Sequence, residues 1–223
     1  MAKKSSMVYG KIYKTYTKRV MDIVLSLIAI AIFAIPAVII MILIKLTSKG
    51  PVFADVPERI GEKAQKFKMY KFRSMIENAH NLLRTDPRFK KLYYEYKRGS
   101  YKLYNDPRVT TVGKFIRKHS LDELPQFVNV FMGDMSLVGP RAYYPDELKN
   151  QQRAYPHTQK LMKKVLSVKP GITGLWQVSG RSEINFDERI VMDSMYVDEI
   201  SLKNDLMIIL KTPLVMLTGK GAV

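Results

Sequence analysis

The chain has no cysteine and only three histidines among its 223 residues. The absence of thiols excludes a disulfide framework and any metal site built on thiolates. The histidines, His80, His119 and His157, lie far apart in the sequence, and no His-Glu-x-x-His pattern typical of a zinc protease occurs. Any metal ion is therefore expected to be a hard cation bound by carboxylate and phosphate oxygens.

Negative charge is also scarce. Lysine and arginine number 37 against 20 aspartate and glutamate residues, so the formal net charge is +17. This excess favours an anionic partner, and nucleic acid, anionic lipid and phosphorylated substrates all fit it. The length suits one ordinary domain with an accessory segment.

One long segment has no charge at all. Ile23 to Ile44 is a run of 22 uncharged residues, and a helix of that length, at about 1.5 Å per residue, is long enough to cross a hydrocarbon core of about 30 Å. The run is too long for a signal peptide, and buried helices of soluble proteins are rarely so apolar. Residues 1–19 mix basic residues with tyrosines, which favours a flank at a membrane surface over a nucleic-acid arm.

Two features favour a bent helix that enters one leaflet and returns. Pro36 removes a backbone hydrogen bond past the middle of the run, so we expect a kink there. Both flanks are basic, which agrees with both ends staying on the cytoplasmic side. A full span stays open as the alternative, because proline is tolerated in true spans. At the entrance, helical spacing predicts an ion pair of Asp22 with Lys18 or Arg19.

The stretch from Ser120 to Arg141 contains the first candidate site. Ser120 and Glu123 have the spacing of a capping box, and apolar residues follow at helical intervals, so a helix is predicted to begin at Ser120. Asp122 and Glu123 would lie in its first turn, where the helix N-terminus and basic residues upstream keep a carboxylate ionised. Such a carboxylate is a nucleophile or a metal ligand. The alternative is a helix cap beside a solvated acid.

The segments before this stretch have a cationic face. Residues 52–56 are predicted to form a short strand, and residues 66–75 alternate cations with apolar groups, which predicts a second strand. Its basic face would either lie in solvent or place Lys71 or Arg73 on a phosphate. Residues 76–98 are predicted to form one or two polar helices.

After Arg141, residues 142–166 are predicted to form a polar, helical connector. Residues 169–181 combine glycines with the only tryptophan and suit either a loop around a polar ligand or a tight structural turn. Residues 187–200 are predicted to form a helix. Residues 206–217 are apolar but too short and too charged to span, which favours an interfacial or docking helix.

Six motifs occur in an order that resembles a known family. They are Lys18-Arg-x-x-Asp22, Lys71-Phe-Arg-Ser-Met75, Asp106-Pro-Arg-Val-Thr110, Ser120-Leu-Asp-Glu-Leu-Pro-Gln126, Gly133-Asp-Met-Ser-Leu-Val-Gly-Pro-Arg141 and Lys169-Pro-Gly-Ile-Thr-Gly-Leu-Trp-Gln-Val-Ser-Gly-Arg181. Each motif alone is weak, but together they are specific. From about Lys18 to its C-terminus, the chain resembles the small monotopic phosphoglycosyl transferases, the bacterial sugar transferase family.

The resemblance implies an activity and a fold. The activity is transfer of a sugar 1-phosphate from a nucleotide diphosphate sugar, with uridine as the expected base, to undecaprenyl phosphate at the cytoplasmic face of the bacterial membrane, at the start of capsule or exopolysaccharide assembly. The fold is α+β and mostly helical. Residues 51–223 would form the compact catalytic domain with short strands, and residues 1–50 the basic flank and re-entrant membrane helix. The sugar, the pathway and a homo-oligomer stay open.

The resemblance also implies residue roles. Asp122 would be the nucleophile that forms a covalent phospho-aspartate, and Glu123 would bind Mg²⁺ with Asp122 as a second ligand. Substrate phosphates are expected at basic positions of the pattern, namely Arg141, Arg117, Arg73 and Lys71. Gln177 and Arg181 would lie near the nucleotide.

Two departures from the family pattern and two rival hypotheses accompany this interpretation. Ala142 stands where the family often has proline, and Ile35 where it often has serine, so the turn and the bend are expected to differ in geometry. One rival is a one-step transferase in which the two acids only bind magnesium. The other is a non-enzymatic basic protein of the membrane surface that binds anionic lipid or nucleic acid.

Overall fold

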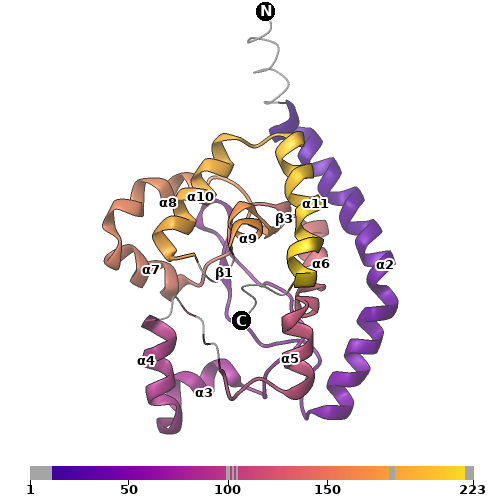
Figure 1. Cartoon of the computed structure of the whole chain (residues 1–223), viewed down its shortest axis with the longest axis vertical. Helices are drawn as coiled ribbons and strands as arrows, with labels where there is room; N and C mark the ends of the chain where they lie inside the picture. The colour runs from indigo at the N-terminus through magenta and orange to yellow at the C-terminus, as the bar shows by residue number, and fades with distance from the viewer. Residues whose placement is uncertain (1–11, 99–100, 102, 104, 181–183, 219–223) are drawn as a thin grey trace, which may run out of the picture.

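The computed structural model describes residues 12–98, 101, 103, 105–180 and 184–218. Helices dominate, and the few strands have two or three residues each (Figure 1). This arrangement confirms the predicted mostly helical α+β class. The α-helices are α2 (Lys18–Thr47), α3 (Ala79–Thr85), α4 (Lys90–Arg98), α5 (Thr111–Lys118), α6 (Gln126–Met132), α7 (Pro145–Ala154), α8 (Gln159–Val165), α9 (Leu175–Ser179), α10 (Phe186–Asp198) and α11 (Leu202–Thr218).

Short helical turns connect these helices. The first, η1, is a π-helical turn that leads directly into α2, and the others are 3₁₀ turns. Their bounds are η1 (Tyr13–Thr17), η2 (Glu62–Ala64), η3 (Pro87–Phe89), η4 (Leu121–Glu123) and η5 (Pro156–Thr158). The predicted helices are therefore confirmed. Residues 76–98 contain α3, η3 and α4, residues 142–166 contain α7, η5 and α8, and the helix predicted over 187–200 is α10.

The strands form two small pairs. β1 (Arg59–Ile60) pairs antiparallel with β2 (Lys66–Phe67), and β3 (Ser136–Val138) pairs parallel with β4 (Gly171–Thr173). The strands predicted over 52–56 and 66–75 form only in part, because beyond β2 they are reduced to isolated bridges that join Phe53 to Phe72 and Met75 to Val109. Around the first bridge, Ala54 N–H donates to the carbonyl of Lys71 and Arg73 N–H to that of Val52, whereas the N–H of Phe72 between them donates to the carbonyl of Asp122 at 2.9 Å.

Helix α2 curves along one side of the domain with its convex side outward (Figure 1). It remains helical through Pro36 and follows a gradual curve, so the kink expected there is not confirmed. Both ends of α2 contact the same domain. Near the N-terminal end, Arg19 donates to the carbonyls of Val130 and Phe131 in α6. Near the C-terminal end, Ile40 and Ile44 pack with Phe72 and Ile116 in one buried cluster.

The outward face of α2 is apolar and exposed. The helical segment Tyr13–Thr47 is long and apolar enough to cross a membrane, with a mean hydropathy of 3.2 in its most apolar window, and only 11% of that window is buried. A core helix of a soluble protein would be mostly buried. Ile32 and Ile35 are 65% and 74% exposed. These observations indicate membrane association.

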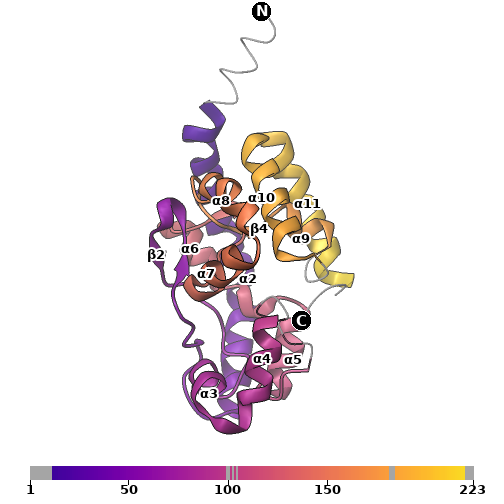
Figure 2. The same ribbon diagram turned by 90° about the vertical axis from the view of Figure 1, so that its left-hand side faces the viewer.

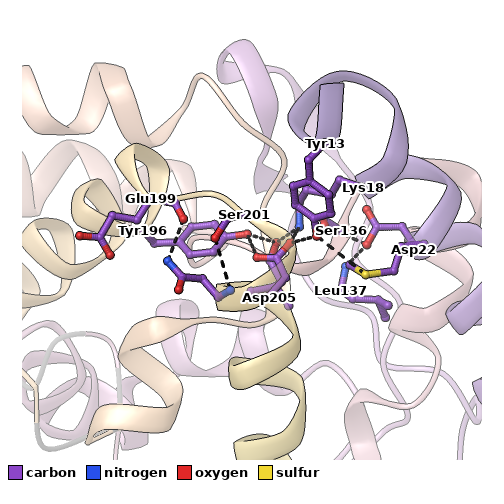
Figure 3. A network of polar contacts seen from close by, with 12 residues as sticks. Tyr13, Lys18, Asp22, Ser136, Leu137, Tyr196, Glu199, Ser201 and Asp205 are labelled. Carbon is purple, nitrogen blue, oxygen red and sulfur yellow. Dashed lines mark hydrogen bonds and ion pairs between the residues drawn. The ribbon is translucent and has the colours of Figure 1, made fainter. Parts of the chain in front are cut away.

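A buried polar network attaches the start of α2 to the rest of the domain (Figure 3). We call it the Asp205 network, formed by Tyr13, Lys18, Tyr196 and Asp205. The Asp205 carboxylate accepts from the hydroxyls of Tyr13 and Tyr196, at 2.7 and 2.8 Å, and from Lys18 Nζ at 2.6 Å. Lys18 Nζ also donates to the carbonyl of Val138 at 2.9 Å. The network therefore joins η1 and α2 to β3, α10 and α11.

The predicted pairing of Asp22 within its own helix is wrong. Oδ1 of Asp22 accepts from the hydroxyl of Ser136 at 3.1 Å and from the backbone N–H of Leu137 at 2.9 Å. Lys18 pairs with Asp205 instead. The buried strand β3 offers Asp22 a backbone N–H, and Asp205 offers Lys18 a buried carboxylate, so both residues bind partners distant in sequence instead of one another.

The remaining elements lie at two levels of the molecule. Helices α8, α10 and α11 lie at the end where α2 begins, and α3 and α4 lie at the opposite end (Figures 1 and 2). The largest buried cluster joins β3, α6, α10 and α11, with Val130 and Val138 completely buried in it. The segments between these two levels surround the cavity described next.

Candidate active site

A cavity of about 540 Å³ opens in the middle of the molecule. Its volume is in the range of sites that bind small molecules and cofactors. Segments distant in sequence line it, from the connection between β2 and α3 through η4 to the first turn of α9. Seven of the eight predicted site residues are among its lining, namely Lys71, Arg73, Arg117, Asp122, Glu123, Arg141 and Gln177. The eighth, Arg181, lies outside the described residues.

Asp122 lies in the 3₁₀ turn η4, and its side chain faces Lys71. Asp122 is only 8% exposed. Its backbone carbonyl accepts from the N–H of Phe72, which brings the segment of Lys71 against the turn. Lys71 Nζ lies 2.6 Å from Oε1 of Glu123 and 3.7 Å from Oδ2 of Asp122. One ammonium group therefore lies between two carboxylates at the wall of the cavity.

The predicted capping box at Ser120 is wrong. Ser120 has a left-handed backbone conformation with φ of 55°, and its side chain forms no cap. The α-helix begins only at Gln126, directly after Pro125. Proline lacks an N–H and is suited to the start of a helix, so α6 begins directly after Pro125 and Asp122 lies in the separate turn η4. Asp122 thus lacks the helix N-terminus expected to keep it ionised.

The electrostatics of Asp122 differ from the expectation as well. Burial raises its pKa, and the nearby carboxylate of Glu123 raises it further, whereas Lys71 and Arg117 lower it; the net shift is upward. For Lys71, burial lowers the pKa, but the two carboxylates outweigh that effect, so the net shift is upward. Lys71 is therefore protonated at neutral pH, and Asp122 beside it is harder to ionise than an exposed aspartate.

The three arginines differ in how they are bound. Arg117 is half-buried and its charge lowers the pKa of Asp122. Arg141 is half-buried, with Nε 3.8 Å from Oε1 of Glu147 and its guanidinium 5.4 Å from the centroid of the Trp176 ring. Arg73 donates to the carbonyls of Ser48 and Lys49 and to the hydroxyl of Ser48, so most of its guanidinium binds the end of α2.

Glycines shape the wall near Arg141. A Cβ on Gly171 would lie 2.1 Å from the backbone nitrogen of Gly139, and one on Gly174 would lie 2.3 Å from the carbonyl oxygen of Gly139. Only glycine allows these backbones to approach so closely. The segment predicted as a loop or tight turn, residues 169–181, contains the strand β4 and the short helix α9 instead. Gln177 in α9 donates from Nε2 to the carbonyl of Ile172 at 2.6 Å.

The sequence interpretation missed a second group of residues in the cavity lining. The guanidinium of Arg59 stacks 3.2 Å from the centroid of the Tyr144 ring, and His80 meets the same ring edge-on at 5.9 Å. Burial, then the charges of Arg59, Arg84 and others, lowers the pKa of His80 to about 4, so this imidazole is neutral at physiological pH. No motif identified Arg59 or His80, since contacts across 60 to 85 residues leave no local signal.

The described residues contain no group of three or more histidine, aspartate or glutamate side chains that would enclose a metal ion. Asp122 and Glu123 supply two carboxylates. Magnesium is typically bound by one or two carboxylates together with substrate phosphates and water. The two acids therefore fit a magnesium ion that arrives with, or is completed by, a phosphorylated ligand.

Fold and site together define a membrane-associated protein with a cavity in which basic residues lie beside acids. Residues 13–219 match the protein family described as Bacterial sugar transferase. The chain belongs to the bacterial sugar transferase family.

Its relatives include proteins of similar length and much longer ones. "Exopolysaccharide production protein ExoY" of Rhizobium meliloti is 42% identical over 205 residues, which cover 92% of this chain and 87% of that protein. "Undecaprenyl-phosphate galactose phosphotransferase" of Salmonella typhimurium is 43% identical over 211 residues, 93% of this chain and 42% of that protein. "Galactosyl transferase CpsE" of Streptococcus agalactiae is 42% identical over 219 residues, 97% of this chain and 46% of that protein. The chain thus spans less than half the length of the latter two.

Proposed function

We propose that this chain transfers a sugar 1-phosphate from a UDP-sugar to undecaprenyl phosphate, through a covalent phospho-aspartate on Asp122, at the start of surface glycan assembly. The observation that supports this most is the buried Asp122 beside Lys71 in a cavity that Arg117 and Arg141 also line. The Salmonella relative is named for undecaprenyl phosphate and a phosphotransferase activity, and the Rhizobium relative for exopolysaccharide production.

The proposed first step is attack at the donor diphosphate. An oxygen of the Asp122 carboxylate bonds to the phosphorus that bears the sugar, and the bond from that phosphorus to the bridging oxygen breaks. UMP leaves with the electron pair. Lys71, Arg117 and Arg141 line the cavity and would offset the repulsion between the carboxylate and the diphosphate.

The proposed second step regenerates the enzyme. A phosphate oxygen of undecaprenyl phosphate attacks the phosphorus of the phospho-aspartate, the bond from that phosphorus to Asp122 breaks, and the carboxylate leaves ionised. The product is a diphosphate that links the lipid to the sugar. Splitting the transfer in this way lets the soluble donor and the membrane-bound acceptor use one cavity in turn.

Mg²⁺ is part of this proposal. Glu123 and Asp122 would bind it, and it would neutralise charge on the diphosphate when bound. Lys71 contacts both carboxylates, so it would remain beside the ion as a further positive charge. A nucleotide diphosphate would supply further oxygen ligands beside these two carboxylates.

We also propose that α2 is a re-entrant, monotopic element and that the cavity lies at the cytoplasmic face. Its support is geometric, since one compact domain contacts both ends of α2, which a helix with ends on opposite faces of a bilayer would not allow.

The natural chain has no cysteine, so single cysteines at Lys14 and Thr47 can be labelled in sealed inverted vesicles. We expect an impermeant maleimide to reach both from the cytoplasmic side. Labelling of the two positions from opposite sides contradicts a re-entrant helix.

The decisive assay for the function separates the two steps. Purified protein is mixed with UDP-sugar and magnesium without lipid, and free UMP is measured. The two-step course predicts a burst of about one equivalent of UMP per enzyme, followed by turnover only when undecaprenyl phosphate is added. Release of UMP only in the presence of lipid supports the one-step alternative. No release under either condition contradicts the proposed function, provided that a panel of UDP-sugars has been tested.

A further inference from the structure

The turn that brings Arg141 to the cavity is attached to helix α10 behind it. Oδ2 of Asp193 accepts hydrogen bonds from the backbone N–H of Arg141 at 3.1 Å and from the hydroxyl of Tyr143 at 3.4 Å. Three residues further along α10, the hydroxyl of Tyr196 donates to the carbonyl of Val138 at 3.0 Å. Residues three apart lie on the same face of a helix. One face of α10 therefore binds the chain both before and at Arg141.

Asp193 lies in a buried group of opposite charges. Asp193 and Arg189 are each 1% exposed, and Glu147 is completely buried. The guanidinium groups of Arg189 and Arg141 lie 4.9 and 5.4 Å from the centroid of the same Trp176 ring. Two cations this close repel one another, and the two carboxylates offset that repulsion. Asp193 thus fixes the backbone of Arg141 and balances the charge behind it.

We propose that Asp193 is a positioning residue for the transfer reaction: it fixes the main chain at Arg141, so that the guanidinium faces the diphosphate of the donor. The inference rests on the proposed function and deepens it. Asp193 is behind Arg141 and not among the residues that line the cavity, so it acts through Arg141. A misplacement of about 1 Å in a group that orients substrate can lower a rate by about 100-fold.

The charge state of Asp193 gives an independent readout. Burial raises its pKa to about 7, against the lowering effects of the Arg141 N–H, the charges of Arg189 and Arg141, and the Tyr143 hydroxyl. Glu147 on α7, 3.8 Å from Nε of Arg141, is the second carboxylate of the cluster. We expect kcat to fall below about pH 7, because a protonated Asp193 accepts the hydrogen bond from the backbone N–H of Arg141 more weakly. In Asp193→Asn that inflection should be absent, while any inflection from Asp122 remains in both enzymes.

A double-mutant cycle tests the proposal. We expect Arg141→Ala to lower kcat by about 10²- to 10³-fold and Asp193→Asn by about 10- to 100-fold, with KM for the lipid unchanged. In the Arg141→Ala background, Asp193→Asn should cause no further loss, because its effect passes through the missing guanidinium. The matched control is Asp198→Asn, an exposed acid on the same helix, which should retain wild-type kcat and the wild-type pH profile.

Two results overturn the positioning role. One is a loss of kcat on Asp193→Asn that is equally large in the wild-type and Arg141→Ala backgrounds. The other is a kcat inflection near pH 7 that persists in Asp193→Asn. If Asp193→Asn does not fold, Tyr143→Phe replaces it in the same cycle, since it removes one hydrogen bond to the same carboxylate. Its smaller loss must likewise disappear in Arg141→Ala, and an additive loss overturns the proposal. A wild-type protein that releases no UMP from any UDP-sugar contradicts the proposed function itself, which distinguishes the two failures.

Discussion

Two buried aspartates of this protein have opposite surroundings. Asp205 is completely buried, and two hydroxyls and an ammonium group donate to its carboxylate within 2.8 Å. Asp122 is almost as buried, but its nearest ammonium group lies 3.7 Å away and its pKa is raised, first of all by burial. The first carboxylate is satisfied by the protein, whereas the second has capacity left for a ligand.

The difference separates an acid that stabilises the fold from one suited to chemistry. A buried charge with a full set of donors stabilises one arrangement of its neighbours, and its removal leaves those neighbours uncompensated. A buried acid with incomplete compensation is a typical feature of functional sites. The two aspartates should therefore respond in opposite ways to the same substitution.

The largest effect is expected at Asp122. Asp122→Asn keeps the shape of the side chain but removes the nucleophile, so kcat should fall by about 10⁴-fold or more. Stability should not fall at pH 8. Because the pKa of Asp122 is raised in the folded protein, its contribution to stability is present at low pH and is lost as pH rises through that pKa, so the neutral amide lacks this penalty. Turnover and thermal unfolding in detergent measure the two effects. Asp198→Asn is the control. Appreciable turnover by Asp122→Asn would exclude Asp122 as the nucleophile.

The reverse pattern is expected at Asp205. Asp205→Asn leaves the ammonium of Lys18 beside a neutral amide, and removal of one partner of a buried ion pair typically lowers the free energy of unfolding by about 3–5 kcal/mol. The burst of UMP per folded molecule should stay near that of wild type, because the network does not line the cavity among the described residues. Chemical unfolding at a temperature where the variant is folded measures the loss. A variant that is as stable as wild type but inactive contradicts the comparison.

Lys71 should shift the working pH of Asp122. Its charge lowers the pKa of Asp122, so in Lys71→Met that pKa rises further and the acid limb of the kcat profile moves to higher pH. At neutral pH we also expect a loss of about 10²-fold, from the missing charge on the phosphates. Lys68→Met, on the same segment and exposed, is the control and should behave as wild type. The comparison is made in the Asp193→Asn background, where Asp193 no longer titrates, and an acid limb that does not move there means that Asp122 is not the titrating group.

The smallest effect is expected at Glu123. Glu123→Gln keeps the side chain near Lys71 but removes one charged oxygen ligand, so half-maximal activity should need about 10-fold more magnesium. Glu95→Gln, an exposed acid on α4, should leave the titration unchanged. A magnesium titration of Glu123→Gln that matches wild type would indicate that Glu123 serves only as the partner of Lys71.

The sequence predicted the long helix, and its motifs selected residues that the fold brings together. The apolar run of Ile23 to Ile44 lies inside α2, since length and composition determine such a helix locally. Asp122, Glu123, Lys71 and Arg141 were identified through motifs, and all four line one cavity. Their roles in catalysis stay predictions.

Most of the errors concern competition between local and distant partners. Spacing alone paired Asp22 with its helix neighbours, yet Ser136 and Leu137, more than 110 residues away, bind it. The strand predicted over 66–75 had the right alternation but no long partner strand, because the bridge to Phe53 is isolated. Ser120 and Glu123 had the spacing of a capping box, but Pro125 delays the helix. Arg59 and Asp193 were missed for the same reason, since only the folded chain brings them to Tyr144 and Arg141.

The most direct test of the account is to locate the phosphosugar on the protein. Wild-type enzyme is incubated with UDP-sugar and magnesium without lipid, quenched, digested and analysed by mass spectrometry. We expect a hexose-phosphate adduct on the peptide that contains Asp122, which disappears when undecaprenyl phosphate is added before quenching and never forms in Asp122→Asn. An active enzyme with no adduct, or with the adduct on another residue, would contradict Asp122 as the group that accepts the phosphosugar.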